Sequence, residues 1–389
     1  MILSKELAAW LRCAAAKDLP FAVWTRPESS TPEAVISCSP VMKRSVFTAD
    51  HKKSGFALNR FSGGVDAADF IDGDIRISTS GVHFFNGTEY QSDPATPLQK
   101  DLFDFHNTNA VATTTLQAPV GASLPDQTNE QDYKQLVEKA VQAIQSDEFL
   151  KVVLSRAEHK ELDPSYDLLT LFSKLATKLP AAFVSLVYLP GQCAWLVGTP
   201  EKLLTCDNKT VETVALAGTQ WLGENVELRQ IGWPDKIIEE QALVCDYIRD
   251  AFTASGIDTL KWRGPRSVQA ANLVHLRSDF TAQIPESSPK LLQQLLAKLH
   301  PTSAVCGMPK PKAAAFLTEH EGYDRDYYTG FLGPVDFNGR TDLFVNLRTS
   351  QIIGSTVVLY VGGGIVSDSQ PDVEWQETIE KTKTVGSIF

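Results

Sequence analysis

The feature that most limits how this chain can fold is the apolar segment Leu359–Val366, which contains three consecutive glycines, Gly362 to Gly364. The pattern predicts an apolar strand that ends in a glycine turn and leads, through a polar loop, into a helix. On that helix Glu374, Glu377 and Lys381 recur at helical spacing and therefore share one face. Taken alone, the helix fits a solvated acidic face on which Lys381 neutralises the carboxylates. The glycines favour a binding site instead, because they leave the backbone uncovered beside those carboxylates.

Net charge limits the kinds of partner that this chain can bind. The 389 residues carry 36 Lys and Arg against 47 Asp and Glu, a formal net charge of -11. Because no excess of basic side chains is available to neutralise phosphates, we expect a small-molecule partner and no nucleic acid. A local basic pocket for a small anion is compatible with this balance.

Cysteine spacing and hydropathy limit the compartment. The six cysteines form no CxxC pair and no zinc-like spacing with the seven histidines, so we expect reduced core thiols. Residues 1–19 carry charged side chains within an apolar pattern, which predicts a short amphipathic helix and not a secretory signal. No uncharged run approaches the ~20 residues of a membrane span. We therefore expect a cytoplasmic protein without a membrane partner, and a monomer.

The order of predicted elements indicates the fold class. Short apolar runs in residues 21–85, separated by turn residues, predict antiparallel strands. Residues 87–127 are weakly periodic, so we expect an extended connection there, which would bound any N-terminal subdomain. From residue 126 onward strand-sized runs alternate with helical periods, and no βαβ unit repeats. This order predicts an α+β fold with a mixed or antiparallel sheet.

Two residues are candidates for acid–base chemistry. Lys151 begins the apolar run Lys151–Arg156, and Glu201 follows Gly198–Pro200 at the start of another strand. A lysine there is ordinarily an edge residue that discourages sheets from pairing, and a glutamate after a turn is ordinarily exposed. If both point into a closed pocket, the lysine becomes a candidate general base and the glutamate a buried acid with a raised pKa. The residues alone leave both alternatives open.

Three carboxylates are candidates for a metal site. Glu240 lies in the first half of a helix predicted at residues 234–252, where acidic side chains are ordinary helix electrostatics. Together with Glu374 and Glu377, however, it could furnish the oxygen ligands that Mg²⁺ prefers.

Other residues fit an anionic ligand, each with a plainer explanation. Gly218 and Thr219 end a strand in small residues, which fits either a tight turn or a backbone contact to an anion. Arg348 closes an apolar strand, where a carboxylate clamp and a structural salt bridge are equally common. The glycines match neither GxGxxG nor GxxxxGK[ST], and no GxSxG motif occurs, so nucleotide binding and a Ser/His/Asp hydrolase are not indicated.

Taken in order, segments from about residue 131 to residue 389 resemble the chorismate-utilising enzymes, and most closely isochorismate synthase. Upstream of about residue 125 the agreement is only general. The order and spacing of the matching strings, rather than any one of them, carry the resemblance: Lys151–Arg156, Gly198–Glu201, Leu216–Thr219, Glu240 with Leu243 and Val244, His300–Pro309, Glu321–Arg325, Arg348 and the stretch from Gly362 to Lys381.

The resemblance implies a single chorismate-binding domain over residues 1–389, with a divergent part at 1–125 and a catalytic core at 126–389. It implies an α+β (mixed α/β) fold whose mainly antiparallel sheet core is flanked by helices. It also implies Mg²⁺-dependent isomerisation of chorismate to isochorismate, in which water adds at ring C2 and the C4 hydroxyl departs.

The resemblance also implies roles for single residues. Lys151 would activate the water, and Glu201 would protonate the departing hydroxyl. Glu240 and Glu377 would bind Mg²⁺, with Glu374 close by. The remaining positions would line the substrate pocket: Gly218, Thr219, Ala304, Tyr328, Arg348, Gly362 and Lys381.

Residue identities choose among the reactions of the family. Lys151 favours water as the nucleophile, because relatives that use an amine carry glutamine there. Ala215 stands where aminodeoxychorismate synthase carries a nucleophilic lysine. Two departures concern the substrate lid: Gln241 replaces a common histidine, and Gln220–Leu222 replaces basic residues. We therefore expect isochorismate synthase for menaquinone or siderophore biosynthesis; the alternatives are a salicylate synthase, a non-catalytic chorismate-binding protein and an acidic structural protein.

Overall fold

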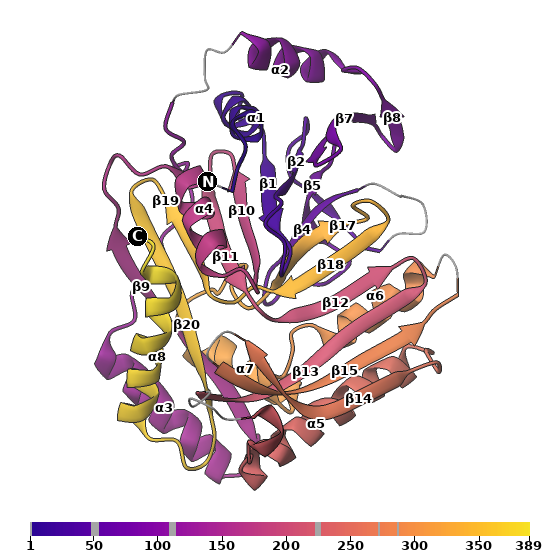
Figure 1. The fold of residues 1–389 in the computed structure, drawn as a ribbon. Helices are drawn as coiled ribbons and strands as arrows, with labels where there is room; N and C mark the ends of the chain where they lie inside the picture. The colour runs from indigo at the N-terminus through magenta and orange to yellow at the C-terminus, as the bar shows by residue number, and fades with distance from the viewer. Residues whose placement is uncertain (1, 48–53, 109–113, 222–226, 271–272, 286–287) are drawn as a thin grey trace.

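The computed structural model describes residues 2–47, 54–108, 114–221, 227–270, 273–285 and 288–389. Within them the chain forms two large antiparallel sheets that share a core, with helices on their outer faces (Figure 1). This arrangement confirms the predicted α+β class with an antiparallel sheet core.

The first sheet, sheet A, has eleven strands in the order β16-β9-β20-β19-β11-β10-β1-β2-β6-β7-β8. One side of the sheet is formed by β16, β9 and β20, from residues 151–365, and the other side by β6, β7 and β8, from residues 75–91. Its strands are β1 (Phe21–Thr25), β2 (Glu33–Ile36), β6 (Ile75–Ser78), β7 (Gly81–Asn86), β8 (Glu89–Gln91), β9 (Lys151–Glu161), β10 (Phe183–Leu189), β11 (Cys193–Thr199), β16 (Gly307–Met308), β19 (Thr349–Ile353) and β20 (Thr356–Ile365).

The second sheet, sheet B, has nine strands in the order β14-β15-β13-β12-β18-β17-β4-β5-β3. Its strands are β3 (Met42–Arg44), β4 (Gly55–Asn59), β5 (Ala68–Asp72), β12 (Lys202–Asp207), β13 (Thr210–Trp221), β14 (Lys261–Ala270), β15 (Leu273–Gln283), β17 (Phe331–Val335) and β18 (Arg340–Val345).

The helices of the described chain cover the outer faces of both sheets. They are α1 (Lys5–Ala16), α2 (Pro97–Asn107), α3 (Glu130–Gln145), α4 (Leu168–Lys178), α5 (Asp235–Ala254), α6 (Pro289–Leu299), α7 (Lys310–His320) and α8 (Pro371–Gly386), with a short 3₁₀ turn η1 (Leu228–Gln230).

Four apolar clusters fill the space between these layers. α1 and α4 cover one face of sheet A, and α5 and α6 cover sheet B. A third cluster joins the two sheets, where Phe183 of β10 stacks on Phe344 of β18 with ring centroids 4.2 Å apart. The fourth cluster gathers α3, α7 and Trp375 of α8 over β9 and the end of β20. This last cluster includes Val152 and Leu154 of β9, the strand that begins at Lys151.

Helix α3 shows why the local sequence folds as it does. The Asn129 side chain caps the helix by accepting a hydrogen bond from the Asp132 backbone N–H at 2.9 Å. Tyr133, Leu136, Val137, Ala140 and Ile144 then recur every three or four residues and are buried together, as the periodicity predicts.

The N-terminal strands are built into the same two sheets as the catalytic core. β1 pairs with β10, and β4 pairs with β17. The connection expected at residues 87–127 is not wholly extended, because it contains β8 and α2. A capping box at Thr96 and Gln99 begins α2, a signal that the weak periodicity of this segment obscured.

Other elements also differ from the prediction. Gly362 to Gly364 form no turn, because they continue β20 through to Ile365 and pair with β9 along their length. The hairpin of β14 and β15 and helix α7 were not predicted.

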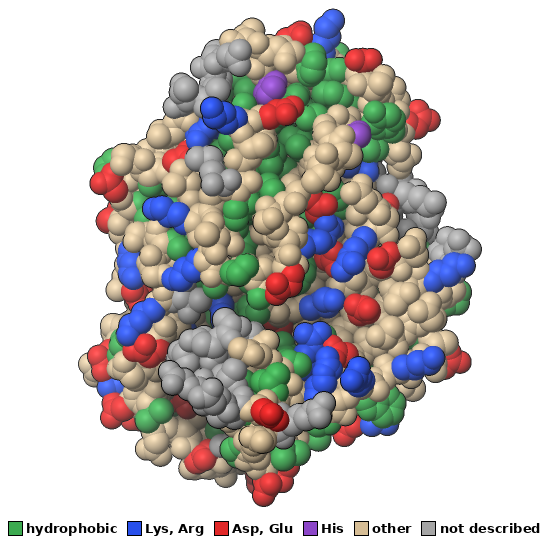
Figure 2. All heavy atoms as spheres, viewed as in Figure 1, with side chains coloured by type: hydrophobic (Ala, Val, Ile, Leu, Met, Phe, Trp, Pro, Cys, Tyr) green, Lys and Arg blue, Asp and Glu red, His purple; other side chains and the backbone are tan. Residues whose placement is uncertain are grey.

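Surface charge on one face is balanced locally. Figure 2 shows Lys and Arg side chains interleaved with Asp and Glu over the region of sheet B. Lys202 pairs with Glu212, while Arg266 and Arg277 both pair with Asp279. These basic side chains are therefore partnered and form no free cationic surface. In the part of the chain that the structure describes, no helix is both long and apolar enough to cross a membrane.

Candidate functional site

The glycine run, Gly362 to Gly364, lies in β20 between β9 and β19. A Cβ on Gly362 would lie 2.5 Å from the Leu154 carbonyl oxygen and 3.2 Å from the Tyr328 hydroxyl. Real Cβ atoms essentially never come closer to backbone than 3.0 Å, so only glycine fits at Gly362 without a backbone shift. The run therefore allows side chains from three other elements to lie directly on its backbone.

Lys151 is one of those side chains. It begins β9, which lies between β16 and β20 and so is not an edge strand. Its Cε and Nζ lie 2.9 and 3.5 Å from the position that a Cβ on Gly364 would take. Its ammonium group forms an ion pair with Glu240 of α5, and the two side chains are 21% and 33% exposed. The predicted base and one predicted metal ligand thus meet at the glycine run.

Glu201 lies in the same site, just before β12. Burial raises the pKa of its carboxyl group from 4.5 to about 7, although the Thr302 hydroxyl, Lys151 and Arg348 each favour the ionised form. Thr302 makes a long contact of 3.5 Å to Oε1, and the Glu201 carbonyl accepts a hydrogen bond from the Val345 N–H. Lys151 and Arg348 are therefore close enough to Glu201 to act electrostatically on its carboxyl group.

Arg348 is held by its backbone between β18 and β19. It adopts a left-handed conformation with φ of 48°, and its carbonyl accepts a hydrogen bond from the Gly198 N–H at 3.1 Å. Burial lowers the pKa of its guanidinium group, and Glu201 opposes that shift. Among the residues described, no carboxylate pairs with the guanidinium, so its planar donor set is available to an anion. Within the described ranges, the structural salt bridge considered from the sequence is therefore not formed.

Glu374 and Glu377 project from α8 onto the middle of the glycine run. Glu374 Oε2 and Glu377 Oε1 lie 3.4 and 3.9 Å from the position of a Cβ on Gly363. The Ser369 hydroxyl donates to Glu374 Oε1 at 2.6 Å. Lys381 donates to the Gly362 carbonyl oxygen at 2.8 Å and pairs with Glu377 at 2.6 Å. Both interpretations of this helix face are thus partly met, since Lys381 pairs with a carboxylate but also contacts the glycine run.

The predicted metal ligands flank one stretch of backbone without forming a closed cluster. In residues 2–47, 54–108, 114–221, 227–270, 273–285 and 288–389, no three His, Cys, Asp or Glu side chains are arranged to hold a metal ion. Glu374 and Glu377 lie over Gly363, while Glu240 reaches the adjacent Gly364 only through Lys151. Carboxylate oxygens are the donors that Mg²⁺ prefers, and a fully buried hydroxyl of Tyr133 without a partner lies beside them. The donor set therefore fits Mg²⁺ in kind, with Glu240 still paired to Lys151.

Of the remaining residues predicted to contact the substrate, only Tyr328 is described at the glycine run. Tyr328 is buried, with its hydroxyl at Gly362 and its ring stacked on Tyr360. Ala304 is half-buried in the turn that carries Thr302. Gly218 has a φ of 63°, and a Cβ there would lie 2.7 Å from the side chains of Trp233, just before α5, and Ile237, in its first turn. The side chain of Thr219 lies outside the described residues.

Sequence reasoning did not predict what two residues do in the site. Gln241 was noted as a departure near the substrate lid, but it is a buried residue of α5 whose amide donates to the Ala215 carbonyl and to the Ser278 hydroxyl. It thereby fastens the helix that carries Glu240 to sheet B. From the sequence, Tyr133 fits an apolar position of an amphipathic helix. Its place one turn into a capped helix gives no sign that its hydroxyl meets carboxylates from α8.

A buried ion-pair network supports β9 from below. Glu321 accepts hydrogen bonds from the Ser155 N–H and hydroxyl at 2.7 and 2.8 Å, and it pairs with Arg325 at 2.5 Å. Arg325 also donates to the Val153 and Val305 carbonyls. The sequence string Glu321–Arg325 was part of the resemblance, and its function here is to fix the strand that presents Lys151.

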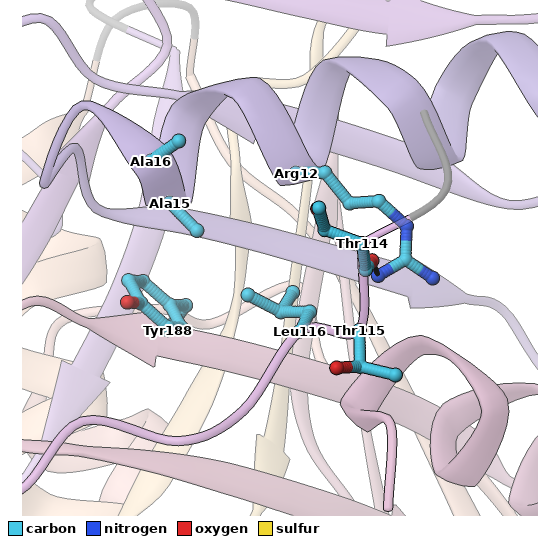
Figure 3. A pocket seen from close by; sticks show the side chains of 7 residues that line it. All are labelled: Arg12, Ala15, Ala16, Thr114, Thr115, Leu116 and Tyr188. Carbon is cyan, nitrogen blue, oxygen red and sulfur yellow. Dashed lines mark hydrogen bonds between the residues drawn. The ribbon is translucent and has the colours of Figure 1, made fainter. Parts of the chain in front are cut away.

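A separate hollow of about 210 Å³ lies between α1, β10 and residues 114–116 (Figure 3). Its one charged side chain, Arg12, forms an ion pair with Asp167 at 2.8 Å and also contacts the Thr114 carbonyl. None of the predicted site residues lines it. The hollow therefore belongs to the packing of α1 and not to the candidate site.

Comparison with known proteins supplies a family. A model of the family described as "Chorismate binding enzyme" matches residues 76–389. The isochorismate synthase MenF of Bacillus subtilis is 30% identical over 278 residues, which are 70% of this chain and 58% of that protein. The isochorismate synthase EntC of Escherichia coli is 28% identical over 272 residues, 69% of this chain and 68% of that protein.

A solved structure of MenF, the menaquinone-specific isochorismate synthase from Escherichia coli, has the same fold. It superposes with a TM-score of 0.78 at 22% identity and covers 98% of this chain and 90% of that one. Anthranilate synthase component I from Streptococcus pneumoniae also superposes, with a TM-score of 0.67. The fold is thus shared by proteins named for different reactions, and the chain spans less than two thirds of the MenF sequences that it matches.

Proposed function

This chain belongs to the family of chorismate binding enzymes, and we propose that it is an isochorismate synthase, which isomerises chorismate to isochorismate with the help of Mg²⁺. The observation that carries the proposal concerns three charged groups: Lys151 lies against Gly364 of the glycine run, and both Lys151 and Arg348 act electrostatically on the carboxyl group of Glu201. These are a candidate base, a candidate acid and an unpaired cation for an anionic substrate. Such a set is what exchange of a ring hydroxyl requires.

The reaction needs one proton to leave and one to arrive. Water adds at C2 and loses a proton to Lys151, while the C4 hydroxyl takes a proton from Glu201 and departs as water. Atoms and charge balance, because one water is gained and one is lost. A pKa of about 7 keeps a substantial fraction of Glu201 protonated at neutral pH, which a proton donor needs.

Lys151 has to change partners before it can act as a base. In the ion pair with Glu240 the lysine carries its proton. It must therefore leave Glu240 and lose that proton before it can accept one from water. Separation of this pair would also free Glu240, the third carboxylate of the set that would hold Mg²⁺.

The anionic groups of the substrate need compensation in an acidic protein. Glu240, Glu374 and Glu377 would hold Mg²⁺, and when bound the ion supplies positive charge to a carboxylate of the substrate. Arg348 supplies a bidentate donor set for a second carboxylate. Lys381, already on the Gly362 carbonyl, supplies a further cation at the wall formed by α8.

Residue identities favour this reaction over others in the family. Lys151, and not a glutamine, begins β9, which suits activation of water. Ala215 is buried in β13, where a nucleophilic lysine would stand in aminodeoxychorismate synthase. Among the described residues nothing favours a salicylate synthase, in which pyruvate elimination follows. The names of the relatives support a place in menaquinone or siderophore biosynthesis. A cytoplasmic location and a monomeric state are proposed from the sequence alone.

The test is identification of the product formed from chorismate. With Mg²⁺ we expect isochorismate, and without Mg²⁺ no turnover. Salicylate formed without an added lyase, or anthranilate formed with ammonia, would overturn the proposal.

Two variants test the assigned roles. Removing a positioned acid or base costs roughly 10²- to 10⁴-fold in rate, so Lys151→Ala and Glu201→Gln should each lower kcat by that much. Circular dichroism and melting curves should show that both variants keep the fold. Near-normal rates in either variant would refute its role.

A further inference from the structure

Tyr133 of α3 carries a hydroxyl group that the folded chain buries without a hydrogen-bond partner among the described residues. The side chain is fully buried, and its ring packs on Trp375 of α8 with centroids 5.8 Å apart. A buried hydroxyl without a partner is destabilising, so a side chain that retains one needs an explanation. Phenylalanine would fill the same space without that penalty.

The hydroxyl lies at the carboxylates of α8. It is 3.8 Å from the position of a Cβ on Gly363, and Glu374 Oε2 and Glu377 Oε1 lie 3.4 and 3.9 Å from the same point. All three oxygens therefore surround the middle of the glycine run. The hydroxyl comes from α3. The other partners of the carboxylates come from α8, where Lys381 pairs with Glu377, and from the loop before it, where Ser369 donates to Glu374.

Chemistry makes this hydroxyl a donor toward those carboxylates. A tyrosine hydroxyl ordinarily titrates at about pH 10, so it carries its proton at neutral pH. A carboxylate only accepts hydrogen bonds, and the phenol has one proton to give. Ser369 already engages Glu374 Oε1, which turns Oε2 toward Gly363 and the phenol.

We propose that Tyr133 is a positioning residue for the metal-binding carboxylates: its hydroxyl donates to the Glu374 and Glu377 pair and fixes which oxygens face Mg²⁺. The inference rests on the proposed function, because it assumes that these carboxylates bind Mg²⁺. Groups that orient metal-ligating carboxylates typically change metal affinity by 10- to 100-fold when they are removed.

The experiment compares Tyr133→Phe with the unaltered protein by titration calorimetry with MgCl₂ and by urea unfolding without Mg²⁺. The substitution keeps the ring on Trp375 and removes only the hydroxyl. We expect the Kd for Mg²⁺ to rise about tenfold or more, and the midpoint of unfolding without Mg²⁺ to stay level or rise. In turnover assays the Mg²⁺ concentration for half-maximal rate should rise more than kcat falls.

Tyr166→Phe is the matched control. The Tyr166 hydroxyl donates to the Gly354 carbonyl and accepts from the Ala118 N–H, away from the carboxylates. Its loss should lower the midpoint of unfolding and leave the Kd for Mg²⁺ unchanged, the reverse of the pattern expected for Tyr133→Phe.

The outcomes separate this inference from the proposed function. If the unaltered protein binds no Mg²⁺ yet folds normally, the metal-dependent function fails. If the unaltered protein binds Mg²⁺ and Tyr133→Phe binds it equally well, the positioning role is overturned. A Tyr133→Phe variant that loses stability as Tyr166→Phe does, with its Mg²⁺ affinity intact, would make Tyr133 a packing residue only.

Discussion

At the scale of single residues, the surroundings of Glu201 decide how the site should respond to pH. Its carboxyl group has a pKa of about 7 in the folded chain, against 4.5 ordinarily, because burial disfavours the charged form. The folded state therefore holds a proton that the unfolded chain has released between these two values. The stability that this proton contributes is fully present below pH 4.5 and is lost as the pH rises through about 7.

The stability of Glu201→Gln should accordingly vary with pH against that of the unaltered protein. Glutamine stays neutral, so the variant escapes the cost of burying a charge at high pH. Between about pH 5 and about pH 8 we expect the stability of the variant to gain on the order of 2 kcal/mol relative to the unaltered protein. Urea unfolding at the two pH values measures this difference. A gap that does not change with pH would show that Glu201 titrates normally.

Activity should show the same titration. Since Glu201 must be protonated to donate, kcat is expected to fall as the pH rises through about 7. A pH profile of kcat at saturating chorismate and Mg²⁺ measures it. A profile that stays flat through that pH would assign the acid to another group.

Single residues also mark the limits of inference from sequence. Lys151, Glu201 and Arg348 could be proposed because charged groups beside apolar strands are unusual and the resemblance supplied their roles. Tyr133 and Gln241 could not, because an aromatic or amide side chain in an amphipathic helix looks like packing. Their contacts come from β20, α8 and sheet B, far away in the sequence, and only the tertiary fold brings those together.

At the scale of elements, β20 is both a strand of sheet A and the backbone against which the side chains of the candidate site lie. The sequence predicts a turn at the glycine run because glycines usually interrupt strands. The structure keeps them in the strand since the ladder to β9 continues through Ile365. Close approach of side chains, and not chain reversal, explains their presence.

Gly364→Ala tests this explanation. Its Cβ would lie 2.9 Å from Lys151 Cε, and the flexible lysine rather than the backbone would move. Displacement of a catalytic group by about 1 Å can cost roughly 10²-fold in rate, so kcat should fall by about that factor while the melting temperature is retained. Gly232→Ala is the control, because nothing lies within 4 Å of its Cβ position. Equal rates in the two variants would argue against the tight contact.

The strand opposite, β9, depends on the buried Glu321–Arg325 pair. Removing one partner of a buried ion pair leaves the other charge uncompensated, so Glu321→Gln should lower the free energy of unfolding by about 3–5 kcal/mol. The exposed pair of Glu380 and Lys383 provides a control, and Glu380→Gln should leave the free energy of unfolding nearly unchanged. Urea unfolding of both variants gives the comparison, and similar losses in the two would contradict a buried network.

At the scale of the whole molecule, the shared core predicts that the two sheets unfold as one cooperative unit. Phe183 and Phe344 stack across the interface between them, with Trp24 of β1 and Phe56 of β4 nearby. The class of fold could be predicted from the alternation of strand and helix periods. The pairing order could not, because β1 and β4 join strands that come more than a hundred residues later.

Phe344→Ala tests whether the sheets unfold together. Loss of a buried aromatic ring should lower the free energy of unfolding by about 3–5 kcal/mol. Hydrogen exchange followed by mass spectrometry should show equal losses of protection in β10 of sheet A and β18 of sheet B. Tyr90→Ala, at a side chain 57% exposed, should change stability by less than about 0.5 kcal/mol. A loss confined to β18 would show two independent units.

The position of β20 also has a consequence for synthesis of the chain on the ribosome. Among the strands that the structure describes, the neighbours of β9 in sheet A are β16 and β20, and β20 is made long after β9. Until β20 emerges, β9 cannot join β19, β11 and the strands beyond it, so its apolar residues await a partner and are open to chaperones. Lys151 on β9 and the carboxylates of α8 come together only once β20 is paired and α8 has folded after it. The proposed activity is therefore expected to appear only when this last part of the chain is in place.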